Sequence, residues 1–473
     1  MTVPDGAGGA IIAWQDGRSA VTETDIFAQH VLASGAVDPA WPANGTALCT
    51  ARRLQDVPEI STDGAGGAIV TWMDGRDLGT VNSVDVYAQH VLASGLVDPR
   101  WPANGLAVST AAGPQEFPVI VDDGSGGAII TWYDLRGSNF DIYAQHVLNS
   151  GIVDPAWPVN GRALCTNISD QFGPTIASDG SHGAIVTWDD NRNASFHPFA
   201  QHVLGSGAVD PVWPVDGLAI SSAGIQEDFP KPVPDGAGGV VVTWQTRDAF
   251  INLHAQHILA TGVADPAWPV NGRVLAPSRS SQTSAAIVSD RAGGAVVAWQ
   301  DDFDDIVAQH VLASGALDPA YPESGRVVVD LPSQQSSPAL VATGGGGAIA
   351  AWSDSRNGVD ADVFAMQVLE AGPTGVADPP APEFAFRHPG PNPARRTTTL
   401  RFSLRREADV TLSIYDAGGR RVRELVSGAQ PAGDHAIGWD LRDERGRAVG
   451  AGIYFARLEV EHRQLTRKVI CLR

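Results

Sequence analysis

The sequence predicts an all-β chain: a seven-bladed β-propeller followed by a small Ig-like β-sandwich. Three observations predict it. One unit recurs seven times, each unit can be divided into four short strands, and the last part of the chain follows a different strand pattern. A long regular period is typical of repeat architectures. The 52 glycines and 32 prolines among 473 residues fit many short strands joined by turns.

The repeated unit is clearest in Asp5–Trp14, which returns almost unchanged as Asp63–Trp72. Every copy ends in a tryptophan, and consecutive tryptophans are 53 to 60 residues apart. A residue type that is present in every copy belongs more readily to the scaffold than to a catalytic site. The seven tryptophans are Trp14, Trp72, Trp132, Trp188, Trp244, Trp299 and Trp352.

The second repeat predicts four strands. Residues 57–62 open with a proline, which cannot donate to a ladder and so fits a strand start. Asp63–Gly67 is a glycine-rich hairpin turn, and the β-branched and aromatic run 68–72 is the second strand. Residues 84–92 and 106–110 are the third and fourth. Four antiparallel strands, seven times, predict a β-propeller, with an open stack or solenoid as the alternative.

The two ends of the array are the weakest copies. Repeat 1 keeps only Thr2–Pro4 as its first strand, and we expect Phe384–Phe386 to be the fourth strand of repeat 7. We therefore divide the chain into a propeller at residues 1–382, a Pro-rich linker at 383–390 and an Ig-like domain at 391–473. The stretch Pro379–Pro393 should act as a semi-rigid spacer between domains that fold separately.

Charge divides the chain in the same way. Residues 1–382 carry 15 Lys and Arg against 42 Asp and Glu, a net charge of −27, whereas residues 383–473 carry 17 against 11, a net of +6. The acidic repeats would repel phosphate backbones, so we expect no nucleic-acid partner. No stretch is apolar for long enough to form a transmembrane helix, so we expect no transmembrane segment.

Cysteine usage points to no disulfide framework and no metal. Cys49 and Cys165 occupy the same place in repeats 1 and 3, too far apart to bridge, and Cys471 lies in the other domain. Zinc spacings are absent, and we expect no cofactor, no metal site and no catalytic residue. The N-terminus has no basic segment followed by an apolar core, so we expect a chain truncated at its N-terminus that has lost a signal peptide.

Two sets of aromatic residues recur. The second-strand tryptophans are expected to be buried between blades, with stacking on sugars as the alternative. A second set lies in the motif Asp-Pro-X-Trp-Pro between the third and fourth strands. We expect each of these rings to fold back over the edge of its own blade, with a carbohydrate-binding ring as the alternative. They are Trp41, Trp101, Trp157, Trp213, Trp268 and Tyr321.

Six histidines recur in the motif Ala-Gln-His. Copies spread around a ring cannot converge on one ion, and a catalytic base needs a distinct partner, which no copy has in the sequence. We predict that they hold no metal and perform no catalysis. They are His30, His90, His146, His202, His257 and His310.

An aspartate and an arginine follow the second strand in five repeats. Loops after strands two and four share one face of a blade, where propellers commonly bind ligands, so these pairs are the candidate ligand-binding residues. The alternative is an ion pair within each loop that shapes the turn. Repeat 5 has Thr246 and Arg247 here, and repeat 6 has Asp301 and Asp302. The candidates are Asp16, Arg18, Asp74, Arg76, Asp134, Arg136, Asp190, Arg192, Asp354 and Arg356.

The C-terminal part has alternating strands with Gly/Asp turns, typical of a small β-sandwich. Ile414–Asp416 followed by Gly419-Arg420, Ala432–His435 and Gly452–Phe455 resemble the sorting domains of type IX secretion cargo and the Ig-like domain of flagellar hook-capping proteins. Asn392-Pro393-Ala394 departs from the Asn-Pro-Phe frequent in such families. The resemblance implies a bacterial protein exported to the cell surface or the medium, with residues 391–473 contacting the secretion machinery.

These observations together favour a secreted or cell-surface binding protein without enzymatic activity. Its expected partner is an extracellular polysaccharide or surface protein, recognised by the propeller. The alternatives are a glycan-active hydrolase with carboxylates at the channel mouth, and a purely structural surface component. A carboxylate pair in a pocket that is not repeated would favour the hydrolase.

Overall fold

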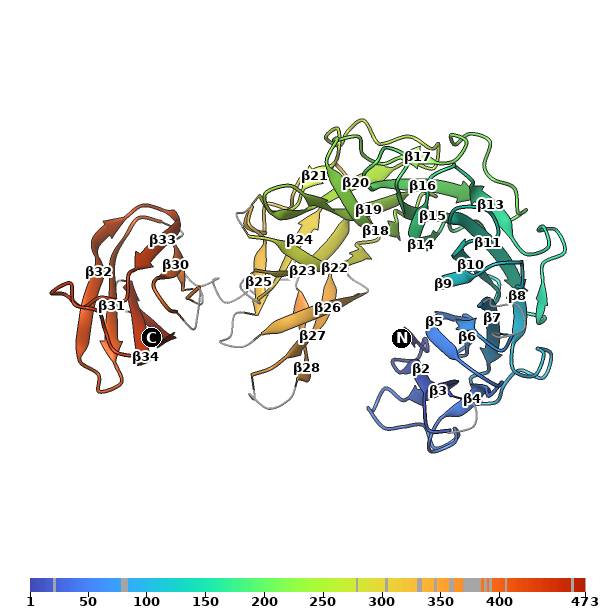
Figure 1. The fold of residues 1–473 in the computed structure, drawn as a ribbon, viewed down its shortest axis with the longest axis horizontal. Helices are drawn as coiled ribbons and strands as arrows, with labels where there is room; N and C mark the ends of the chain where they lie inside the picture. Colours follow the sequence, from blue (N-terminus) through green and yellow to red (C-terminus); the bar gives the residue numbers. More distant parts are fainter. Residues whose placement is uncertain are drawn as a thin grey trace. The chain divides into compact units, whose positions relative to one another are not determined.

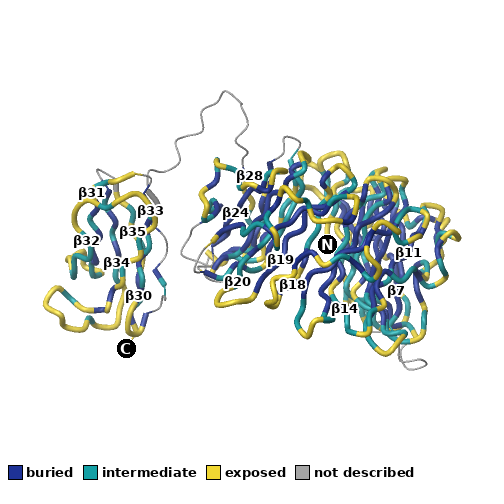
Figure 2. Tube along the Cα trace, turned by 90° about the horizontal axis from the view of Figure 1, so that it is seen from above, coloured by how far each residue is buried: buried dark blue, intermediate teal, exposed yellow. Residues whose placement is uncertain are grey.

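The computed structural model describes residues 1–19, 23–77, 84–277, 280–302, 305–329, 334–343, 347–356, 361–368, 384–386, 389–390, 394–404, 406–460 and 463–472. The chain is all-β, as predicted. Its described part contains no helical segment with the length and hydrophobicity of a membrane span. Strands are mostly buried and turns mostly exposed (Figure 2).

The repeats form seven successive antiparallel sheets of the blade type (Figure 1). The first holds β1 (Thr2–Pro4), β2 (Ala10–Asp16), β3 (Asp25–Val31) and β4 (Thr46–Cys49). The second holds β5 (Gln55–Thr62), β6 (Ala68–Asp74), β7 (Asp85–Val91) and β8 (Leu106–Ser109). The third holds β9 (Gln115–Asp122), β10 (Ala128–Asp134), β11 (Asp141–Leu148), β12 (Ile152–Val153) and β13 (Arg162–Cys165).

The remaining sheets repeat this order. The fourth holds β14 (Gln171–Ser178), β15 (Ala184–Asp190), β16 (His197–Val203) and β17 (Leu218–Ala219). The fifth holds β18 (Gln226–Pro234), β19 (Val240–Arg247), β20 (Ile251–Ile258) and β21 (Arg273–Val274). The sixth holds β22 (Gln282–Ser289), β23 (Ala295–Asp301), β24 (Ile306–Val311) and β25 (Arg326–Val329). The seventh holds β26 (Gln335–Ala342), β27 (Ala348–Asp354) and β28 (Asp362–Val368).

Adjacent sheets pack through alternate residues of the second strand. Ala68, Val70 and Trp72 lie in a cluster with repeat 1, whereas Ile69 lies in the next cluster with repeat 3. Because successive strand residues point to opposite faces, one strand serves two interfaces. This explains why these strands are apolar throughout rather than alternating.

The chain divides into two compact units: Met1–Ala298 with Gln309–Gly325 and Leu340–Ala348, and Trp299–Ala308 with Arg326–Ala339 and Ile349–Arg473. The features described below for repeats 1 to 5 belong to the first unit. Closure of the seven sheets into a ring stays a prediction.

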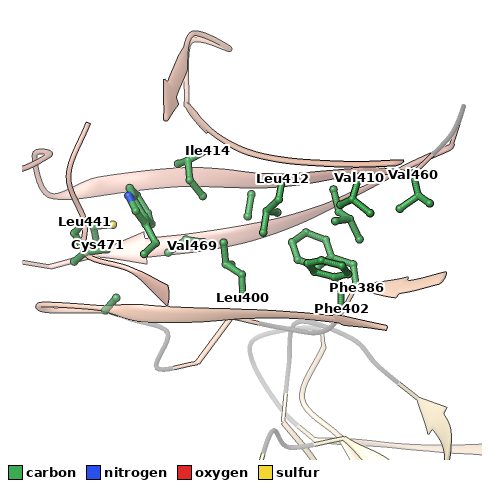
Figure 3. Packing of buried hydrophobic residues seen from close by; sticks show 14 of the residues in the cluster. Phe386, Leu400, Phe402, Val410, Leu412, Ile414, Leu441, Val460, Val469 and Cys471 are labelled. Carbon is green, nitrogen blue, oxygen red and sulfur yellow. The ribbon is translucent and has the colours of Figure 1, made fainter. Parts of the chain in front are cut away.

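The C-terminal part is a β-sandwich of two sheets. One sheet orders β29 (Phe384–Phe386), β30 (Thr398–Leu404) and β33 (Gly433–Trp439). The other orders β32 (Arg421–Gln430), β31 (Ala408–Asp416), β34 (Gly452–Val460) and β35 (Arg463–Cys471). Figure 3 shows their apolar side chains meeting between the layers, with Phe386 beside Phe402.

The prediction for Phe384–Phe386 was wrong. This segment pairs with β30 in the sandwich, Phe384 opposite Leu404 and Phe386 opposite Phe402, rather than with repeat 7. Phe386 is fully buried in the sandwich core. The run Phe-Ala-Phe has the pattern of a strand but does not reveal its partner. The segment 383–390, predicted as a linker, therefore contributes a strand to the sandwich, and most of the predicted spacer Pro379–Pro393 lies outside the described residues.

Candidate functional site

The second-strand tryptophans are core residues. Trp72, Trp132, Trp188 and Trp244 are fully buried, whereas Trp14 of the first repeat is partly exposed. Each ring lies against the glycine of its own Asn-Gly or Asp-Gly turn: a Cβ added to Gly105 would lie 2.6 Å from the Trp72 ring, and Gly105 has a φ of +99°. Only glycine permits both this approach and this backbone conformation.

The loop tryptophans join neighbouring repeats, which corrects the expectation that each ring covers its own blade. Trp41 packs on His30 of its own repeat but donates its indole N–H to the carbonyl of Ala93 in repeat 2, at 3.2 Å. A Cβ on Gly95 would lie 2.7 Å from that ring. The same bond recurs from Trp101 to Asn149, Trp157 to Gly205, Trp213 to Ala260 and Trp268 to Ala313.

Each predicted Asp–Arg pair forms a clamp inside its own repeat. Asp74 accepts hydrogen bonds from the Trp72 indole at 2.8 Å, and from the backbone and guanidinium of Arg76. The Arg76 guanidinium also donates to the carbonyl of Asn104 at 2.7 Å and lies 3.8 Å from the centroid of the Tyr87 ring. Asp74 is fully buried, so it is fixed by these partners.

The same clamp holds the other four pairs. The arginine covers the third-strand aromatic ring in each: Phe27 for Asp16–Arg18, Tyr143 for Asp134–Arg136, Phe199 for Asp190–Arg192 and Phe364 for Asp354–Arg356. The ion pair of each clamp lies within one repeat, as the ion-pair alternative predicts. Arg76 and Arg192 also donate to the thiols of Cys49 and Cys165 in the preceding repeat, at 3.5 and 3.3 Å. Ligand binding by these ten residues stays a prediction.

The histidines each bridge two carboxylates. His90 Nδ1 lies 2.9 Å from Asp98 in the long loop, and its Nε2 lies 3.0 Å from Asp63 in the hairpin. The preceding Gln89 donates to the carbonyl of Pro102 in the same loop. The motif Ala-Gln-His therefore fixes the long loop to the hairpin. Its other copies, with bonds of 2.8 to 2.9 Å and 2.9 to 3.0 Å, are His30, His146, His202, His257 and His310.

The reasoning that no copy has a distinct partner was therefore wrong, because each imidazole has two. The sequence hid them: one aspartate comes eight residues later and the other 20 to 27 residues earlier. Burial lowers the pKa of His146, but hydrogen bonds to Asp123 and Asp154 outweigh it and raise the pKa overall. That these histidines hold no metal and perform no catalysis stays a prediction.

Repeat 5 breaks the pattern. Thr246 stands where other repeats have the clamp aspartate, and the indole of Trp244 donates instead to Glu227 at 2.9 Å. The other oxygen of Glu227 lies 3.2 Å from His197 Nδ1. Both Glu227 and His197 are buried. Glutamate therefore replaces the missing aspartate from a different strand.

Two further carboxyl groups lie beside it. Asp228 pairs with the Arg247 guanidinium at 2.6 Å, and Asp189 accepts the N–H of Phe229 at 2.9 Å. Asp189 and Asp228 are 8% and 5% exposed. Burial, together with the nearby charge of Asp228, raises the pKa of Asp189 to about 8, so this carboxyl is largely protonated at neutral pH. We name Asp189, Asp228, Phe229 and Arg247 the Asp189 cluster.

A row of aromatic rings leads to this cluster from repeat 3. Phe117 stacks on Tyr133 at 5.4 Å, and Tyr133 meets Phe140 edge-on at 5.1 Å and Phe172 at 5.7 Å. Phe172 lies 6.1 Å from Phe196 and stands opposite Asp189 in the sheet register. We name the rings of Phe117, Tyr133, Phe140, Phe172 and Phe196 the aromatic band. Phe117 and Phe172 lie where first strands begin and Tyr133 where a second strand ends, whereas Phe140 and Phe196 directly precede third strands. All five lie on the loop face that the sequence predicted for ligands.

The exposed rings stand on strained backbone. Phe117 and Phe229 are 46% and 53% exposed and have φ angles of +50° and +59°. Each precedes a proline at a bulge in the first strand, where the register with the second strand shifts. Positive φ is an outlier for a bulky residue, and such strain often accompanies function. At the equivalent place repeat 4 has Gly173, with a φ of +56°.

Sequence reasoning missed the band because it examined what the copies share. The signal lay in their differences: the place of Tyr133 is taken by Gln15, Met73, Asp189, Gln245, Gln300 and Ser353 in the other copies. Aligning the repeats on one another would have shown aromatic residues gathered in repeats 3 to 5.

Comparison with known proteins finds a family match for part of the chain. Residues 394–463 match the FlgD Ig-like domain family. No curated protein matches the chain. Solved structures share low identity: FlgD from P. aeruginosa is 23% identical over 16% of this chain and 59% of that one, with a TM-score of 0.14.

Two other solved structures cover more of the chain. An α-L-arabinanase from Penicillium chrysogenum, complexed with arabinobiose, is 12% identical over 66% of this chain and 93% of its own, with a TM-score of 0.39. PorZ, a bacterial surface component of the type IX secretion system of Porphyromonas gingivalis, is 13% identical over 98% of this chain and 58% of its own, with a TM-score of 0.35.

Proposed function

We propose that the chain is an exported or surface-held binding protein. Its repeats bind an extracellular polysaccharide or a surface protein, and its C-terminal domain directs export or attachment. One observation carries the binding role. The polar residues shared by the repeats are engaged in the scaffold, whereas repeats 3 to 5 present an unshared aromatic surface on the loop face. Exposed aromatic groups beside a few fixed polar groups are typical of binding sites.

The export role is supported by the FlgD Ig-like match at residues 394–463 and by the resemblance of the same strands to type IX sorting domains. The test is to place residues 384–473 behind a signal peptide and a reporter in a bacterium that has type IX secretion. The reporter should reach the surface or the medium. Retention in the periplasm, while an authentic sorting domain exports the same reporter, would contradict the role.

The binding role is tested with the purified full chain on arrays of polysaccharides and of bacterial surface proteins. Saturable binding to a member of either class is the expected result. A chain that is folded by circular dichroism and binds neither class would contradict the proposal and favour a structural surface component.

A glycan hydrolase is the second candidate, and one observation favours it. Burial raises the pKa of Asp189 to about 8, and Asp228 in the same cluster is paired with Arg247 at 2.6 Å. A buried carboxyl group with a raised pKa near an ion-paired one resembles the acid and its partner in a glycosidase. Release of reducing ends from the polysaccharides on the array, abolished in Asp189→Asn, would establish this activity. Stable ligands without such release would exclude it for those substrates.

A further inference from the structure

We propose that the aromatic band and the Asp189 cluster form one elongated site, and that its ligand is a neutral polysaccharide chain. This inference rests on the proposed binding function and names its site and ligand class. Four properties of the described residues carry it: the sequence of rings, the gap at Gly173, the fixed polar edge, and the charge of the repeats.

The rings provide an extended surface rather than a pocket. Neighbouring centroids from Phe117 through Tyr133 and Phe172 to Phe196 are 5.4, 5.7 and 6.1 Å apart. Phe117 stacks on Tyr133, whereas Tyr133 and Phe172, and Phe172 and Phe196, meet edge-on at 82° and 68°. Pyranose rings have apolar C–H faces and polar rims, so a sugar can pack on an exposed ring face at either end while the edge-on rings between them provide an apolar floor. Buried rings would only pack, but Phe117 at one end and Phe229 beyond the other are about half exposed.

The gap at Gly173 separates these two exposed rings. Gly173 occupies the bulge position held by Phe117 and Phe229 in the flanking repeats, and it is exposed. A Cβ added there would meet only Asp189 Oδ2, at 3.5 Å. The side chain is therefore missing where a chain passing from one exposed ring to the other would cross repeat 4.

The polar edge is fixed in advance. Asp228, almost wholly buried, holds the Arg247 guanidinium, whose side chain remains 39% exposed. That guanidinium lies 5.7 Å from the centroid of the Phe229 ring. An exposed donor group beside an exposed ring can bind a sugar hydroxyl while the ring contacts the sugar face. Arg247 loses little entropy on binding because its partner already orients it.

Charge selects the ligand class. The repeats carry a net charge of −27, which would repel a polyanionic glycan. A cationic protein segment would need free carboxylates at the site, but those beside the band are engaged: Asp228 by Arg247, Asp189 by the N–H of Phe229, and Glu116 by Tyr133. Neutral polysaccharide is the class that the surface fits.

The test uses Phe117→Gly/Phe229→Gly in the full chain. Glycine suits the positive φ at both places, as Gly173 shows, so the variant should fold while losing both rings. The matched control is Val57→Gly, the same change at the same bulge of repeat 2, outside the band. The probes are xylan, mixed-linkage β-glucan and hydroxyethylcellulose, with alginate as the polyanion and chitosan as the polycation, in affinity gel electrophoresis.

The expected result is that the wild type and Val57→Gly bind at least one neutral probe, and that the double variant binds it about tenfold more weakly or worse. Arg247→Ala should also weaken it, by about threefold to tenfold. Equal binding by the double variant would overturn the site while leaving the binding function intact. Preference for alginate or chitosan, or binding to surface proteins alone, would overturn the ligand class. A wild type that binds neither polysaccharide nor protein would overturn the proposed function itself, and this inference with it.

Discussion

The buried carboxyl group of Asp189 lowers the free energy of unfolding of the chain at neutral pH. Its carboxyl has a pKa of about 8 in the folded chain because it is buried, against 3.8 in a freely solvated group. The unfolded chain therefore binds fewer protons between these values, and stability falls as pH rises from about 4 to about 8. A neutral side chain of the same shape would remove this cost.

We therefore expect Asp189→Asn to be more stable than the wild type at pH 8, by roughly 1 to 3 kcal/mol, with the difference vanishing near pH 4. The amide oxygen can still accept the N–H of Phe229. Urea unfolding at both pH values measures it. An Asn variant less stable than the wild type at pH 8 would show that burial does not raise the pKa of this carboxyl.

The histidine bridges give a second pH dependence. Because the folded pKa of His146 is raised, its contribution to stability is complete below the unfolded value of about 6.5 and is lost as pH rises through the folded value. His146→Gln should therefore be destabilised most at low pH, with the deficit shrinking as pH rises. His182→Gln is the control, since that ring bonds a hydroxyl and a backbone carbonyl. Thermal melts from pH 5.5 to 8.5 measure both, and parallel pH profiles for the two variants would contradict the bridge.

At this scale the sequence identified the repeated residues but not all their partners. The prediction that the second-strand tryptophans are buried is confirmed for Trp72, Trp132, Trp188 and Trp244. The partner of Trp41 lies 52 residues away in another repeat, and a backbone carbonyl leaves no trace in sequence. Asp189 was overlooked because its role depends on the N–H of a residue in the next repeat.

At the scale of the element, the bulge in the first strand stores strain in several repeats. Val57 has a φ of +50° although it is β-branched, which is the most unfavourable side chain for that conformation. We expect Val57→Gly to leave stability unchanged or raise it by up to about 1 kcal/mol, because relief of strain offsets the lost contacts. The control is Val119→Gly in the regular part of β9, which should be destabilising. Calorimetry measures the stability of both variants. Equal losses of stability in Val57→Gly and Val119→Gly would show that Val57 is not strained.

Strand positions within a repeat were predictable because glycine turns, prolines and β-branched runs mark them locally. The expected strands at residues 68–72 and 106–110 correspond to β6 and β8 within about two residues. The bulge was not predictable. Nothing in Val57-Pro58 or Phe117-Pro118 announces a positive φ, since a residue before proline normally adopts an extended conformation.

At the scale of the whole molecule, β29 decides where the chain can be divided. Phe386 is fully buried against Phe402 and the rest of the sandwich core. A fragment of residues 384–473 should fold alone, whereas one of residues 391–473 should be less stable by about 3 kcal/mol or more, since it leaves a cavity where the ring was. Denaturant unfolding of the two fragments measures it. Equal stabilities would show that β29 is dispensable and would restore the boundary at residue 391.

The hydrogen bonds of the loop tryptophans, which we call the joints between repeats, have a consequence for how the repeat array can evolve. The loop tryptophan of one repeat always meets the same place in the next: Trp101 meets the carbonyl of Asn149, and Trp157 meets that of Gly205. Deleting one repeat between these two bonds would place the indole of Trp101 beside the carbonyl of Gly205, which would form an equivalent joint. The array can therefore grow or shrink by tandem duplication or loss of a coding segment without inventing a new interface. Substitutions that create a new binding surface can then accumulate at positions that take no part in a joint. Phe117, Tyr133 and Phe172 occupy such positions.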